Sequence, residues 1–260
     1  MLSVMGKDAD GAALEGLLRG SGIGTSYLLA SGGRITTSKA RIMGRNQQML
    51  RLDSETTRDL SGEEEEFLLE EVRRFIDKER PQVLIFEDYN KGVLTHRVIR
   101  EAVALCRHHG VITAVDPKRK NFFSYEGVTI FKPNLKEVKE GLNLLLEEVR
   151  LPALQQIHEQ LLARLKHQIS FITLSERGVF FQDGVHASHV PSHLRNIADV
   201  SGAGDTVIAV ASLIYAATHD VRLMAEVANI AGGLVCEEVG TAAINKARLL
   251  EECERLLDAR

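Results

Sequence analysis

The residues with the clearest chemical potential lie at positions 199–206, Asp-Val-Ser-Gly-Ala-Gly-Asp-Thr, where an apolar stretch typical of a helix begins. Glycine lets the backbone turn tightly and approach a ligand. The first amides of a helix lack internal acceptors and attract anions. The carboxylate of Asp205 would lie beside this anion site, where it can accept a proton from an attacking hydroxyl. A glycine-rich helix start with an acidic residue that complements the helix dipole is the simpler alternative.

A second candidate follows the strand that we expect to end at Phe131, in the run Lys-Pro-Asn-Leu-Lys-Glu at 132–137. Asn134 and Glu137 are three residues apart, so their side chains share one face of a helical turn. Glu137 suits a Mg²⁺ ion bound through water molecules. The alternative is a capping box, with Asn134 as N-cap and Glu137 as its partner.

Three further polar runs each follow a predicted strand: Asp88-Tyr89-Asn90-Lys91-Gly92, Asp116-Pro117-Lys118, and residues 173–178. In α/β proteins, ligands bind at the carboxyl ends of parallel strands. Together with the two runs above, they predict a cleft along one side of a sheet.

The elements that must position these runs alternate along the chain. Buried strands are predicted at 83–86, 111–115, 129–131 and 169–174, with a β-hairpin over 178–182 and 185–190. Helices are predicted after Ser61, whose pairing with Glu64 is a capping box, and at 95–109, 152–166, 203–217, 221–239 and 247–258. We therefore expect one α/β domain, a mostly parallel sheet with helices on both faces. The first fifty residues are predicted to form short strands, with a hairpin over 35–43 and 47–52 as a small β excursion.

Composition excludes several classes of protein. The 260 residues carry a formal net charge of −4, so we expect no nucleic-acid partner. The longest apolar stretch, residues 206–217, is shorter than the roughly 18 residues that cross a membrane, and the first ten residues do not form a signal peptide. The distant Cys106, Cys236 and Cys253 predict reduced thiols and a cytoplasmic protein. The histidines at 108–109 and 186–189 are interpreted as solvated side chains rather than metal ligands.

Taken together, these motifs resemble those of the ribokinase-like (PfkB) carbohydrate kinases. Residues 199–205 are similar to the D-[TV]-x-G-A-G-D signature of that family. Within it, the runs at 45–53, 88–94, 116–118, 133–137 and 173–178 are most similar to the kinase domain of the bifunctional heptose-7-phosphate kinases/ADP-heptose synthases. The resemblance extends from about Val4 to Ile244 and implies a three-layer sandwich with a small β lid.

The resemblance also implies roles for single residues. Asp205 would be the catalytic base, and Gly202, Ala203 and Gly204 would form the anion hole. The ATP site would comprise Asn134, Leu135, Lys136, Glu137, Ser175, Glu176, Gly178 and Asn229. Arg45, Asn46, Gln48 and Lys91 would face the sugar phosphate. Glu137 would hold Mg²⁺ through water, and Asp199 a monovalent cation such as K⁺.

The implied function is ATP-dependent phosphorylation of the anomeric hydroxyl of D-glycero-D-manno-heptose 7-phosphate, in an enzyme that acts alone or as a homodimer. The alternatives are another sugar kinase of the family, or a catalytically weak nucleotide-binding remnant. The family's first strand carries a substrate aspartate and leads to a Gly-Gly loop, which residues before Val4 do not supply. We therefore expect a kinase domain shortened at its N-terminus. We also expect no nucleotidyltransferase domain, because its His-x-Gly-His motif is missing.

Overall fold

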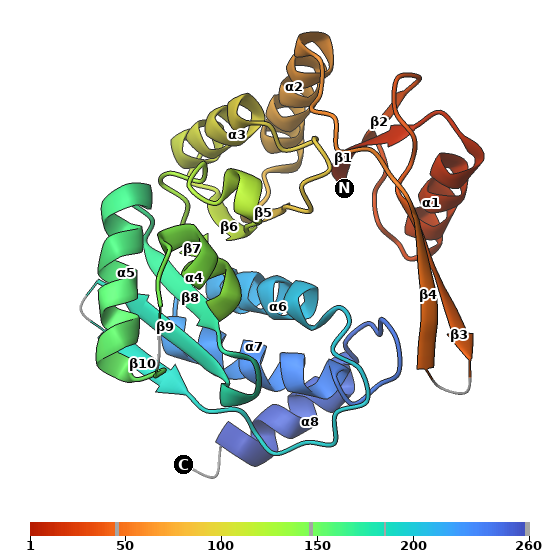
Figure 1. Cartoon of the computed structure of the whole chain (residues 1–260). Coiled ribbons are helices and arrows are strands. Elements are labelled where there is room, and N and C mark those ends of the chain that lie inside the picture. Colours follow the sequence, from red (N-terminus) through yellow and green to blue (C-terminus); the bar gives the residue numbers. More distant parts are fainter. Residues whose placement is uncertain (45–46, 146–147, 185, 258–260) are drawn as a thin grey trace. The chain divides into compact units, whose positions relative to one another are not determined.

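The computed structural model describes residues 1–44, 47–145, 148–184 and 186–257, and the chain forms two compact units (Figure 1). Unit 1 comprises Met1–Pro81 and Asn90–Leu105. Unit 2 comprises Gln82–Tyr89 and Cys106–Arg260. The segment Gln82–Tyr89 therefore lies in unit 2, although the chain on both sides of it belongs to unit 1.

Unit 1 begins with a β-α-β motif. Strands β1 (Leu2–Gly6) and β2 (Tyr27–Ser31) pair in parallel, and helix α1 (Ala9–Gly20) connects them. The side chain of Asp8 caps α1 by accepting a hydrogen bond of 2.8 Å from the Gly11 amide. The prediction of short strands throughout this region was therefore wrong for α1. Its glycines lower helix propensity and conceal the helix in a reading of the sequence alone.

Strands β3 (Ser38–Gly44) and β4 (Gln47–Ser54) form the predicted antiparallel hairpin. Ala40 pairs with Leu52, and Ile42 pairs with Leu50, so these apolar residues share one face of the ribbon. The side chains of Ile42, Leu50 and Leu52 are 46%, 50% and 55% exposed. One face of the hairpin is thus apolar and open to solvent.

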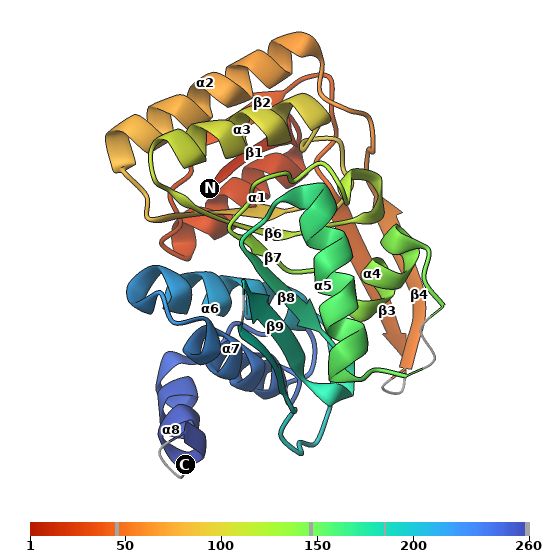
Figure 2. The same ribbon diagram turned by 90° about the vertical axis from the view of Figure 1, so that its left-hand side faces the viewer.

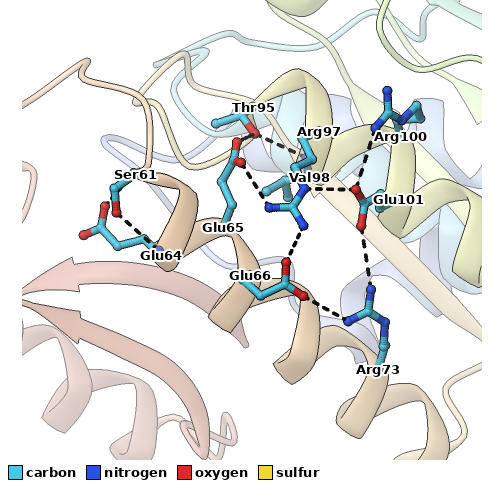
Figure 3. A network of polar contacts seen from close by, with 10 residues as sticks. All are labelled: Ser61, Glu64, Glu65, Glu66, Arg73, Thr95, Arg97, Val98, Arg100 and Glu101. Atoms are coloured by element: carbon cyan, nitrogen blue, oxygen red, sulfur yellow. Dashed lines mark hydrogen bonds and ion pairs between the residues drawn. The ribbon is translucent and has the colours of Figure 1, made fainter.

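Helices α2 (Gly62–Glu79) and α3 (His96–His108) pack in unit 1 around a core formed by Val4, Leu60, Leu68, Leu69 and Val98. The predicted capping box starts α2, because the Glu64 amide donates to Ser61 Oγ and the Ser61 amide donates to Glu64. Figure 3 shows how the acidic first turns of α2 meet α3: Arg97 contacts Glu65, Glu66 and Glu101. The acidic run is therefore a helix start that also pairs with a neighbouring helix.

Unit 2 contains a six-stranded sheet in the order β10-β9-β8-β7-β6-β5. Strands β5 (Val83–Glu87), β6 (Ile112–Asp116), β7 (Ile130–Phe131) and β8 (Ile169–Thr173) are parallel. Strands β9 (Val179–Asp183) and β10 (His186–Val190) complete the sheet in antiparallel pairing. The predicted mostly parallel α/β architecture is confirmed.

Helices lie on both faces of this sheet (Figure 2). Helices α4 (Leu135–Leu142) and α5 (Leu151–Leu165) are on one side, and α6 (Ala203–Thr218) and α7 (Val221–Val235) are on the other. The last helix of the described residues is α8 (Lys246–Leu257). Phe171 of β8, Ile208 of α6 and Met224 of α7 are fully buried in one apolar cluster of unit 2. This packing holds α6 against the sheet. No helix of the described ranges has the length and apolar character needed to cross a membrane.

Candidate functional site

The start of α6 has the tight turn that its two glycines predict. Gly202 adopts a φ of +81°, a left-handed conformation that favours glycine, and it is the N-cap of the helix. The carboxylate of Asp199 holds the preceding loop, because it accepts hydrogen bonds from the amides of Ser201 (2.9 Å) and Gly240 (3.1 Å). The Ala203 amide donates to Val200 at 3.3 Å within the turn. The amide of Ala203 is therefore partly engaged by the loop itself.

Asp205, in the first turn of α6, is one of three carboxylates that converge in unit 2. Oxygen atoms of Glu87, Asp116 and Asp205 lie within 4.8 Å of one another. The parallel pairing of β5 and β6 places Glu87 beside Asp116 at the carboxyl ends of both strands. Partial burial, and then the charges of Asp205 and Asp116, raise the pKa of Glu87 to about 7. Glu87 was not singled out from the sequence, although it directly follows a predicted strand (83–86), as Asp116 follows the predicted strand at 111–115.

A buried ion pair lies beneath the glycine turn. The ammonium of Lys132 is 3.0 Å from Asp116, and the Lys132 side chain is only 2% exposed. A Cβ added to Gly204 would lie 3.4 Å from Oδ2 of Asp116 and 3.9 Å from Nζ of Lys132. The start of α6 therefore approaches this pair at van der Waals distance.

A second lysine links Asp116 to the other predicted motif. Nζ of Lys118 lies 2.7 Å from Glu137 and 3.4 Å from Asp116. Although burial opposes it, the charges of these two carboxylates raise the pKa of Lys118. The ammonium of Lys118 thus lies between the carboxylates of Asp116 and Glu137. Carboxylate oxygens are also the ligands that Mg²⁺ prefers.

The capping box at the start of α4 is present. The Glu137 amide donates to Asn134 Oδ1 at 2.9 Å, and the Asn134 amide donates to Glu137 Oε2 at 2.8 Å. The simpler alternative is therefore correct as a description of the local structure, and one oxygen of Glu137 still contacts Lys118. Leu135 and Lys136 form the first turn of α4, where the Lys136 side chain is 84% exposed.

The predicted nucleotide-pocket residues after β8 and Asn229 of α7 contact the same short segment, residues 190–192. Gly178 has a φ of +92°, and a Cβ there would lie 2.1 Å from the Val190 carbonyl oxygen. Ser192 donates a hydrogen bond to the Glu176 carbonyl. Asn229 donates to the carbonyl of Pro191 at 2.9 Å. Glu176, Gly178 and Asn229 are therefore linked by the end of β10 and the residues that follow it.

The predicted sugar-phosphate residues belong to unit 1. Lys91 forms an ion pair with Glu55, and the hydrogen bond from Lys91 is the main cause of a lowered pKa at Glu55. Gln48 lies on β4, opposite Met43, where the register of the hairpin shifts. Arg45 and Asn46 lie outside the described residues. Their roles stay predictions.

Among the described residues, the histidines of both runs lie outside the group of three carboxylates whose oxygen atoms are close enough to share a metal ion. His186 is 80% exposed, and His189 contacts the Arg177 carbonyl oxygen. The interpretation of these histidines as surface residues agrees with this arrangement.

Comparison with known proteins places these motifs in a family. The family model described as "pfkB family carbohydrate kinase" matches residues 1–248. The Bifunctional protein HldE of Desulfatibacillum aliphaticivorans is 36% identical over 249 residues, which cover 95% of this chain and 50% of that protein. HldE of Methylobacillus flagellatus is 37% identical over 253 residues, covering 96% and 51%. This chain thus spans about half the length of the curated relatives that it matches.

Solved structures share the fold. Phosphofructokinase-2 from Escherichia coli in complex with potassium superposes with a TM-score of 0.80 at 16% identity, over 95% of this chain and 79% of that one. Ribokinase from Arabidopsis thaliana, complexed with ribose and ATP, gives a TM-score of 0.74 at 15% identity, over 96% and 80%. At this identity the likeness concerns the fold alone.

Proposed function

This chain belongs to the pfkB family of carbohydrate kinases, and from this premise we propose that it phosphorylates the anomeric hydroxyl of D-glycero-D-manno-heptose 7-phosphate with ATP. The observation that carries the proposal is the position of Asp205, one residue after the glycine turn and beside the buried Lys132–Asp116 pair. The choice of a heptose phosphate rests on the 36–37% identity to HldE proteins over nearly the whole chain.

The reaction assigns a task to each part of this arrangement. The anomeric oxygen attacks the γ-phosphorus of ATP, and the bond between that phosphorus and the β-phosphate oxygen breaks. The hydroxyl proton passes to Asp205, and ADP leaves with the bridging oxygen. The first amides of α6 at Gly202 and Gly204 stabilise charge that develops on the phosphoryl oxygens. Asn229 and the segment Ser175–Gly178 border the nucleotide.

The acidic side chains of unit 2 fit a divalent cation, since carboxylate oxygens are the ligands that Mg²⁺ takes. We assign Glu137, acting through water, to that ion, with Asp116 joined to it by Lys118. Bound Mg²⁺ supplies neutralisation of the phosphate charge. We also assign a monovalent cation to the loop that Asp199 organises, where the carboxylate oxygens are the available donors.

The experiment incubates the purified chain with ATP, MgCl₂ and one sugar at a time: heptose 7-phosphate, fructose 6-phosphate or ribose. ADP release and ³¹P NMR of the product report the transfer. We expect a new anomeric phosphate with the heptose substrate only. Asp205→Asn should lower the rate by roughly 10²–10⁴-fold and leave ATP binding, measured by calorimetry, largely intact. Transfer to another sugar alone would favour a different kinase of the family, and ATP binding without any transfer would favour a nucleotide-binding remnant.

We further propose a homodimer formed through the hairpin of β3 and β4, and a cytoplasmic location. The exposed apolar face of Ile42, Leu50 and Leu52 supports the first, because such faces commonly mark contacts between proteins. The three free cysteines support the second. Light scattering tests the dimer: Leu50→Lys together with Leu52→Lys should give a monomer, whereas Lys39→Glu on the polar face should not.

A further inference from the structure

Tyr89, in the polar run that follows the predicted strand at 83–86, makes a long-range contact with the candidate base. Tyr89 donates a hydrogen bond of 2.7 Å to Oδ1 of Asp205, across 116 positions of sequence. Both residues belong to unit 2. A general base holds the hydroxyl that it deprotonates at about 2.6–3.2 Å. The phenol oxygen of Tyr89 therefore occupies the position from which an attacking hydroxyl would approach this oxygen of Asp205.

The phenol is a poor substitute for that attacking hydroxyl. Partial burial, followed by the hydrogen bond to Asp205, raises the pKa of Tyr89. The hydroxyl consequently stays protonated at neutral pH and keeps donating to the carboxylate. The Tyr89 side chain is also 49% exposed, so it can leave without opening the core of the unit. These properties describe a group that covers the base and can be displaced.

A kinase needs such a cover because water competes with its sugar. In the wasteful reaction a water oxygen attacks the γ-phosphorus, the bond to the β-phosphate oxygen of ADP breaks, and the water proton passes to Asp205. We propose that Tyr89 is a positioning residue that covers Oδ1 of Asp205 until the sugar hydroxyl displaces it, and that it thereby suppresses ATP hydrolysis when no sugar is bound. This inference rests on the proposed function in one respect, the role of Asp205 as the base.

The test measures ADP release from ATP and MgCl₂ without any sugar. Tyr89→Phe removes the phenolic hydroxyl and keeps the ring, and we expect hydrolysis to rise about tenfold, the effect of losing one hydrogen bond to a charged group. Tyr215→Phe is the matched control, because it removes a phenol from α6 in the same unit, and we expect no change there. The double variant Tyr89→Phe/Asp205→Asn should return hydrolysis to the parental level.

Each outcome decides one point. Equal hydrolysis by the parent and by Tyr89→Phe overturns the inference, and so does a rise that persists in the double variant. With the sugar present, Tyr89→Phe should increase the ratio of hydrolysis to transfer, which a purely structural role of Tyr89 would leave unchanged. If Tyr89→Phe raises hydrolysis through Asp205 while no sugar is phosphorylated, the proposed substrate fails and the covering role of Tyr89 stands.

Discussion

The ammonium of Lys132 lies 3.0 Å from the carboxylate of Asp116, and both side chains are buried at the carboxyl end of the parallel sheet of unit 2. Lys132 follows β7, and its amide continues the ladder by donating to the Val115 carbonyl at 2.9 Å. The ion pair therefore joins neighbouring strands directly below the glycine turn of α6. A buried charge that loses its partner is strongly destabilising.

Replacement of either Lys132 or Asp116 alone should therefore destabilise the fold. We expect Lys132→Met to lower the free energy of unfolding by about 3–5 kcal/mol, because Asp116 loses the ammonium that lies 3.0 Å away and is left with the longer contact, 3.4 Å, to Lys118. Lys132→Met together with Asp116→Asn should recover a large part of the loss, since no unpaired charge is then buried. Urea denaturation of the three variants measures both effects. Similar stability of the single and double variants would show that charge pairing is not the cause.

The two glycines at the start of α6 should respond differently to alanine. Gly202 has a φ of +81°, and a Cβ there would lie 3.0 Å from Cγ2 of Thr241. We expect Gly202→Ala to cost about 1–2 kcal/mol, the penalty of a left-handed conformation for an L-residue. Gly204 lies inside the helix with ordinary contact distances, and Gly204→Ala should be neutral or stabilising by up to about 1 kcal/mol. Thermal and urea unfolding compare the two variants. An equal loss of stability in Gly202→Ala and Gly204→Ala would show that the left-handed conformation of Gly202 is not what makes it sensitive.

Glu137 takes part in a capping box and has a proposed metal-binding role. The substitution Glu137→Gln should remove the second without removing the first. Glutamine at this position can still accept the hydrogen bond from the Asn134 amide, so Glu137→Gln should keep the capping box and the melting temperature. It removes the charge that pairs with Lys118 and that we assign to Mg²⁺. We therefore expect a higher Mg²⁺ concentration for half-maximal ATP binding, measured by calorimetry at several MgCl₂ concentrations. An unchanged Mg²⁺ dependence would remove Glu137 from the metal site.

A buried trio in unit 2 predicts loss of stability in mild acid. Ser170 Oγ lies 2.8 Å from Nδ1 of His158 and 2.6 Å from Nε2 of His167. Burial, and then the neighbouring His158, lower the pKa of His167 from 6.5 to about 3. Burial likewise lowers the pKa of His158. Because the unfolded chain takes up these protons first, their contribution is complete above pH 6.5 and is lost as the pH falls toward 3.

The size of this effect can be measured by urea denaturation between pH 7 and pH 4.5. His167 alone should reduce the free energy of unfolding by about 2.5 kcal/mol over that interval, because the loss is about 1.4 kcal/mol per pH unit once the pH is below its unfolded pKa of 6.5. His167→Gln replaces the imidazole with a group that does not titrate, so the slope should decrease by about one proton. An identical slope in the parent and the variant would show that His167 is protonated in the folded state.

The sequence alone determined the features that depend on near neighbours in the chain. The capping boxes at Ser61–Glu64 and Asn134–Glu137 each join residues three apart, so their geometry follows once a helix begins there. The mostly parallel sheet also follows from apolar runs that alternate with helices, whereas the order of its strands came only from the structure. Even here the prediction failed for α1, where glycines weaken the helical signal and the cap at Asp8 decides the structure.

Tertiary structure decided which polar groups meet. Glu87 and Asp116 come together because β5 and β6 pair in register, and Lys132 is buried because β7 delivers it beneath α6. The contact between Tyr89 and Asp205 spans 116 residues. No local pattern encodes such a contact, because it depends on the packing of α6 against the sheet. The sequence could thus propose Asp205 from its helix start, whereas only the fold showed which side chain lies against its carboxylate.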